Sequence, residues 1–118
     1  MKIIVENSTW NNLGDGFYQF TLEKILKYIF PESKIFYGEG PVKRAFHPNR
    51  FQYSNALRIN ETQSADLHVF SGPILMSIDN VYGKVIKNII AKGDNYALLS
   101  VSCSGLSGNR LNQVCKFL

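Results

Sequence analysis

The start of the chain constrains its fold more than any other feature. Residues 3–5 (Ile-Ile-Val) are a short apolar, β-branched run, which is typical of a strand buried on both faces. A polar, turn-rich stretch follows from Asn7 to Gly14. From Asp15 onward apolar residues recur at helical spacing, and Pro31 ends the pattern. A strand, a polar Gly-Asp turn and an amphipathic helix together predict the first unit of an α/β domain.

The predicted first helix has a polar side and an apolar side. Asp15 is a candidate N-cap residue, because its side-chain oxygen can accept the first helical N–H groups. Charged residues occupy one side of the helix. The apolar side is formed by residues at i, i+4, i+7, i+8 and i+11, namely Tyr18, Leu22, Ile25, Leu26 and Ile29.

Later segments repeat this alternation. Further strands are predicted at residues 34–37, 66–70 and 96–101. The clearest helix covers residues 79–92, with Asp79 as its N-cap and Gly93 just beyond its end. A last helical pattern covers residues 111–118. The apolar stripe of the 79–92 helix consists of Val81, Tyr82, Val85, Ile86, Ile89 and Ile90.

These elements predict an α/β domain with a parallel sheet of about four strands, right-handed crossovers and helices on both faces. Residues 38–64 carry most of the loop signals, and a short helix is expected near Tyr53 to Asn60 because so long a loop without structure is unusual. Residues 1–118 are interpreted as a single domain. The apolar end at Phe117-Leu118 leads us to expect the N-terminal part of a larger protein, with a small self-contained domain as the alternative.

Composition and charge narrow the functional classes. Hydrophobic residues make up 45% of the 118 residues and charged residues 19%, which is a globular composition. The formal net charge of +4 is spread along the chain, so nucleic-acid binding is not expected. No signal peptide or apolar run of membrane-spanning length is found, which predicts a cytoplasmic protein without a membrane span. Cys103 and Cys115 are therefore interpreted as reduced thiols.

Motifs for common cofactors and metals fail when tested. Gly38-Glu39-Gly40 lacks the third glycine of a dinucleotide fingerprint, and no P-loop or zinc spacing occurs. No cofactor or metal is therefore predicted. A Cys103 pair with His47 or His68 has no pattern to support it, and His68 is interpreted as a packed or edge histidine. The basic residues near His47 are interpreted as a solvated loop, with a clamp on an anionic donor as the alternative.

The loops after the strands are the expected ligand site, because open parallel sheets bind ligands beyond the carboxyl ends of their strands. The segment from Asn11 to Asp15 is the most informative of them. Its structural interpretation is a Gly14 turn and an Asp15 cap, and this interpretation is favoured on the residues alone. The functional alternative is that Asp15 accepts hydrogen bonds from a hydroxylated ligand while Asn11 and Asn12 face the cleft.

Two segments carry a family resemblance. Residues 7–15 (Asn-Ser-Thr-Trp-Asn-Asn-Leu-Gly-Asp) lead into a helix, and residues 65–75 (Ala-Asp-Leu-His-Val-Phe-Ser-Gly-Pro-Ile-Leu) form an apolar strand with a small-Gly step at its end. Together they resemble the polysaccharide pyruvyl transferase family, which shows an Asn-x-Gly-Asp turn after its first strand and a small-Gly-Gly step later. Pro73 departs from that pattern, because it stands where a second glycine is usual and lacks an N–H.

The resemblance implies a Rossmann-like N-terminal lobe of a two-lobed, GT-B-type fold. It implies transfer of a pyruvyl ketal group from phosphoenolpyruvate to a sugar hydroxyl, with a sugar or polysaccharide precursor as the substrate. Family members are longer, and no catalytic residue can be carried over. The alternative is a non-catalytic small α/β domain that binds a phosphorylated sugar or nucleotide. The candidate substrate-binding residues are Asn11, Asn12, Gly14, Asp15, Ser71 and Gly72.

Overall fold

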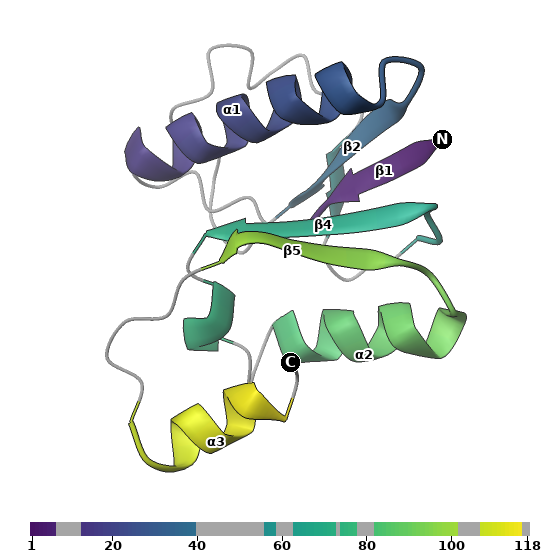
Figure 1. Cartoon of the computed structure of the whole chain (residues 1–118). Coiled ribbons are helices and arrows are strands. Elements are labelled where there is room, and N and C mark those ends of the chain that lie inside the picture. The colour runs from purple at the N-terminus through teal and green to yellow at the C-terminus, as the bar shows by residue number, and fades with distance from the viewer. Residues whose placement is uncertain are drawn as a thin grey trace.

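A computed structural model describes residues 1–6, 13–39, 56–58, 63–72, 74–77, 82–101 and 107–116 (Figure 1). Its strands form one sheet in the order β3-β2-β1-β4-β5. The strands are β1 (Lys2–Val5), β2 (Lys34–Glu39), β3 (Ala56–Arg58), β4 (Leu67–Gly72) and β5 (Tyr96–Val101). The helices are α1 (Leu13–Ile29), the 3₁₀ turn η1 (Ile74–Ser77), α2 (Gly83–Lys92) and α3 (Asn109–Cys115).

All four strand pairings in this sheet are parallel. The central strand β1 lies between β2 and β4, so that Ile3 is opposite both Ile35 and Leu67. Helix α1 covers one face of the sheet, whereas α2 and α3 lie on the other (Figure 1). The prediction of an α/β domain with a parallel sheet and helices on both faces is therefore confirmed, as are the four strands that the sequence pattern indicated.

The predicted helix near Tyr53 to Asn60 is wrong where the structure describes it. Residues Ala56–Arg58 instead form the edge strand β3, in register with residues 37–39 of β2. The short segment gains backbone hydrogen bonds from a neighbouring strand, and a sequence pattern of three residues cannot reveal such tertiary pairing. The remainder of the predicted helix lies outside the described residues.

Each face of the sheet carries its own apolar core. Under α1 the buried residues are Ile3, Val5, Leu22, Leu26, Ile35 and Val69. Under α2 and α3 they are Phe70, Ile74, Leu75, Tyr82, Val85, Ile86, Ile89 and Val114. Successive residues of a strand point to opposite faces, and this period places Val69 in the first core and Phe70 in the second. The sheet is therefore the shared wall of two cores.

The two long helices match their predicted stripes to different degrees. In α2 the stripe residues Tyr82, Val85, Ile86 and Ile89 are buried, but Ile90 is exposed. In α1, Leu22 and Leu26 are buried, whereas Ile25 and Ile29 are exposed, because this helix presents a narrower face to the sheet. The stripe predicted for α1 is thus correct only in part. Tyr18 and Val81 belong to the part of the chain whose side chains the structure does not describe.

Helix ends were predicted more accurately at the carboxyl than at the amino terminus. Gly93 caps α2 in the left-handed conformation, with φ 74°, and its N–H bonds back to the helix carbonyls, as predicted. Tyr82 occupies the N-cap position of α2, and Asp79 lies outside the described residues. Helix α1 begins at Leu13, so Asp15 lies within its first turn rather than at the cap. The last helix is confirmed as α3.

Candidate functional site

The order of the strands defines the place where a ligand is expected. The strand order changes direction between β1 and β4, because β2 and β3 are added on one side of β1 whereas β4 and β5 are added on the other. Ligands of open α/β sheets bind at such a switch point, beyond the carboxyl ends of the strands. In Figure 1 this edge lies at the left, where β4 ends and α1 begins. We call it the carboxyl edge.

The structure brings some of the sequence-predicted site residues to the carboxyl edge. Gly14 and Asp15 belong to the first turn of α1, and Ser71 and Gly72 end β4. Because β1 pairs with β4 in parallel, the segment after β1 and the segment after β4 both leave the sheet at this edge. Asn11 and Asn12 lie outside the described residues.

The end of β4 has an irregular backbone. Its pairing with β5 shifts register between Ser71 and Gly72, and Gly72 has φ 77°, a conformation that glycine adopts without steric cost. Both residues are buried. Such an irregularity changes the direction of the chain at the carboxyl end of β4. The neighbouring Pro73 lies outside the described residues.

A buried ion cluster that the sequence pattern did not predict lies near the amino ends of β4 and β5, away from the carboxyl edge. His68 in β4 has no solvent exposure, and its Nδ1 lies 2.6 Å from Oε1 of Glu6, the residue directly after β1. On the other side of the ring, Nε2 lies 3.2 Å from Oδ2 of Asp94, in the loop between α2 and β5. The side chains of Glu6 and Asp94 are 5% and 13% exposed. We call these three residues the His68 cluster.

The two carboxylates determine the protonation state of the ring. A neutral imidazole donates only one hydrogen bond, so His68 must be an imidazolium to donate to both ionised carboxylates. Burial lowers the pKa of His68, but the hydrogen bonds and charges of Glu6 and Asp94 together outweigh it and raise that pKa above its ordinary value of 6.5. The hydrogen bond from His68 is also the main cause that lowers the pKa of Asp94 below 3.8.

Backbone hydrogen bonds fix the surroundings of the His68 cluster. Oδ2 of Asp94 also accepts the N–H of Ala65 at 3.1 Å, and the N–H of His68 donates to the carbonyl of Asn95 at 2.9 Å. The N–H of Glu6 donates to the carbonyl of Val69 at 2.9 Å. The cluster is therefore held by the same strand pairings that build the centre of the sheet.

The interpretation of His68 as a packed histidine is confirmed, and its role as a base for a thiol is excluded by its partners. Both ring nitrogens are within hydrogen-bond distance of carboxylates, so neither nitrogen is left for a cysteine. Cys103 and His47 lie outside the described residues, and Cys115 is exposed at the end of α3. The parts of the chain that the structure describes contain no group of three or more His, Cys, Asp or Glu side chains suited to a metal ion.

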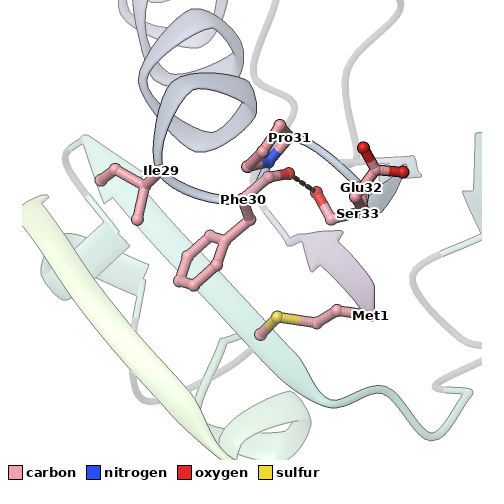
Figure 2. Close-up of a pocket in the computed structure, with 6 residues that line it drawn as sticks. All are labelled: Met1, Ile29, Phe30, Pro31, Glu32 and Ser33. Atoms are coloured by element: carbon pink, nitrogen blue, oxygen red, sulfur yellow. Dashed lines mark hydrogen bonds between the residues drawn. The ribbon is translucent and has the colours of Figure 1, made fainter.

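A shallow pocket lies at the opposite edge of the sheet (Figure 2). It has a volume of about 240 Å³ and is mostly apolar. Its residues come from the chain start and from the turn between α1 and β2, and the Ser33 hydroxyl is occupied by a hydrogen bond to the carbonyl of Phe30. Because this pocket is formed at the amino ends of the strands, it is not the ligand site expected for a parallel sheet. The lining residues are Met1, Ile29, Phe30, Pro31, Glu32 and Ser33.

Comparisons with known proteins do not name a family for this chain. No protein-family model matches it, and neither does any curated protein or solved structure. The described helices include none that is both long enough and apolar enough to cross a membrane. Function is therefore argued from the carboxyl edge and the residues around it.

Proposed function

We propose that this chain is a polysaccharide pyruvyl transferase-like protein, corresponding to the Rossmann-like N-terminal lobe of a GT-B-type fold. One observation carries the proposal. Two segments resemble the family. Residues 7–15 come soon after β1, and residues 65–75 contain β4; these two strands are neighbours that pair in parallel. Two motifs can contribute to one ligand site only if they lie at the same edge of the sheet. The parallel pairing of β1 with β4 meets this condition, because it puts the carboxyl ends of both strands at one edge.

The chemistry of the carboxyl edge supports an anionic, hydroxylated ligand. Helix α1 begins there, and the unpaired N–H groups of a helix start attract phosphate and carboxylate groups. Phosphoenolpyruvate carries both groups, and a sugar precursor carries hydroxyls that Asp15 can accept from. The proposed substrate-binding residues are Asn11, Asn12, Gly14, Asp15, Ser71 and Gly72. A cytoplasmic location and the absence of a metal or cofactor belong to the same proposal.

Ligand binding by the purified chain tests this proposal. Phosphoenolpyruvate, and separately a phosphorylated sugar, is expected to raise the melting temperature, because a ligand that binds only the folded state stabilises it. Asp15→Asn is expected to reduce the shift caused by the phosphorylated sugar, because Asp15 is proposed to accept hydrogen bonds from sugar hydroxyls. Glu32→Gln is the matched control, since Glu32 is exposed at the opposite edge of the sheet and should leave the shift unchanged. Equal shifts for both variants, or no shift with either ligand, would contradict the proposal.

The second candidate function is a non-catalytic domain that binds a phosphorylated sugar or nucleotide. The two buried cores favour it, because they show a sheet covered on both faces by helices of this chain alone. Incubation with phosphoenolpyruvate and a glycoside acceptor separates the two functions. Release of phosphate together with a pyruvylated glycoside supports the transferase. Binding without turnover supports the non-catalytic domain.

A further inference from the structure

We infer that the His68 cluster is a proton-dependent clamp that fastens the carboxyl end of β1 to the α2–β5 loop across β4. This inference does not depend on the proposed transferase function. It follows from the position of one buried ring between two carboxylates that come from distant parts of the chain, 62 and 26 residues away from His68.

The geometry joins three segments through one side chain. Ile4, Glu6, His68 and Phe70 share the face of the sheet that α2 covers, because Ile4 is opposite His68 and alternate residues of a strand share a face. Glu6 therefore reaches the ring from the carboxyl end of β1, and Asp94 reaches it from the opposite end of the sheet. When the ring is doubly protonated, both contacts are charge-assisted hydrogen bonds.

Loss of one proton opens one side of the clamp. A neutral ring keeps a single N–H, so one of its nitrogens presents a lone pair to a carboxylate instead of a donor. With no exposure at the ring, water cannot replace the lost partner without local rearrangement. The deprotonated state therefore weakens the link either to β1 or to the α2–β5 loop.

The other charged and titratable groups around the ring do not replace these partners. On the same face, Lys2 of β1 places its Nζ 3.0 Å from Oε1 of Gln63, and Asp66 before β4 accepts the N–H of Lys2 at 2.6 Å. Tyr96 of β5 is opposite His68 in register. Lys92 at the end of α2 acts through Asp94, whose pKa it helps to lower. Glu6 and Asp94 are thus the groups that control the protonation of His68.

The pH window follows from the signs of the two shifts. The pKa of His68 is higher in the folded than in the unfolded chain, so its contribution to stability is complete below 6.5 and is lost as the pH rises through the folded value. The pKa of Asp94 is lower in the folded chain, so its contribution is present above 3.8 and is lost as the pH falls through the folded value. The clamp is strongest between these limits.

Two measurements on the full chain test the clamp. Histidine-selective NMR follows the ring signals as the pH is raised, and His47→Gln assigns them because the chain has only two histidines. His68 is expected to titrate above 6.5 in the wild type. Asp94→Asn is expected to move that midpoint downward, because it removes one of the two carboxylates that raise the pKa of the ring.

Thermal unfolding gives the second readout. The melting temperature of the wild type minus that of His68→Gln is measured from about pH 5 to about pH 9. This difference is expected to be positive at the acidic end and to shrink by several degrees as His68 loses its proton, whereas the difference for the exposed control Glu32→Gln stays constant. If His68→Gln does not fold, the same difference is measured with Asp94→Asn.

A His68 midpoint at or below 6.5 would overturn the inference. A melting-temperature difference that does not change with pH would overturn it equally, because the cluster would then be a packing contact without a proton-dependent component. A raised midpoint together with a difference that shrinks as the pH rises would support it.

Discussion

The two faces of the sheet are stabilised in different ways. The buried cluster described under α1 consists of apolar side chains, among them Ile3, Leu26 and Val69. The face under α2 has an apolar core of similar kind, but it also includes Glu6 and His68 among its buried residues. Apolar burial does not depend on protonation, whereas a buried ion cluster does. Among the described residues, the buried cluster under α1 is therefore insensitive to pH, whereas the ion cluster on the other face is not.

The largest expected effect is the loss of unfolding free energy when a buried isoleucine is truncated, and it should be the same on both faces. Ile3→Ala under α1 and Ile89→Ala under α2 each remove a side chain with no exposure, and each should lower the free energy of unfolding by about 2–5 kcal/mol at any pH. Chemical denaturation at two pH values measures this. Ile90→Ala is the matched control on α2, because that side chain is 56% exposed and should cost much less. A similar cost for Ile89 and Ile90 would contradict the described packing.

The second effect separates the faces. Glu6→Gln keeps the size of the side chain but removes one charge from the His68 cluster, and it should lower the free energy of unfolding by about 1–3 kcal/mol near pH 6. The loss should diminish at higher pH, where the wild-type ring is already neutral. Denaturation curves across the pH range measure it, with Glu32→Gln as an exposed control. A loss that is constant with pH would remove the distinction between the faces.

The third effect is smaller, because Asp94 is more exposed than Glu6. Asp94→Asn should lower the melting temperature between the two pH limits and bring the pKa of His68 down toward 6.5. Asp66→Asn is the control, since Asp66 accepts the backbone N–H of Lys2 rather than the ring. NMR titration of His68 in the two variants distinguishes them. An equal downward shift in both would show that general charge, and not the hydrogen bond, sets the pKa.

The smallest effect is expected on the outer surface of α1. Tyr28 is 89% exposed, so Tyr28→Ser should change the free energy of unfolding by no more than about 0.5 kcal/mol. Denaturation at the same two pH values measures this change. A larger loss would mean that the outer side of α1 is covered in solution, and the apolar core of that face would then extend beyond Leu22 and Leu26.

The fold was predictable because its elements are local. The β-branched run 3–5 and the stripe of α2 depend on the period of their own residues, and Gly93 ends a helix through its own backbone freedom. The edge strand β3 was not predictable, since three residues carry no period and gain their structure from β2. The exposed Ile25 shows the same limit, because the width of the face that α1 buries is set by the sheet beneath it.

The candidate site divides in the same way. The Gly14-Asp15 pair and the Ser71-Gly72 step were predicted from adjacent residues, and the pairing of β1 with β4 directs both segments toward one edge. The His68 cluster was missed because its members are far apart in the sequence. Alternate residues of a strand share a face of the sheet, so the β1–β4 register, in which Ile4 is opposite His68, would have placed Glu6 and His68 on the same face. That register is a tertiary fact, and the α2–β5 loop that supplies Asp94 is another.

The all-parallel order of the strands has a consequence for how the chain is made. The N–H of Lys2 in β1 bonds to Asp66, which follows it by 64 residues, so the middle of the sheet cannot close until β4 has left the ribosome. Strand β2 is the only partner that β1 can meet early among the strands described. Asp94 emerges later still, so the ion cluster cannot form until the α2–β5 loop has been made. Non-local pairing of this kind slows folding. Until β4 is made, the apolar first strand lacks one of its two neighbours and is exposed to aggregation.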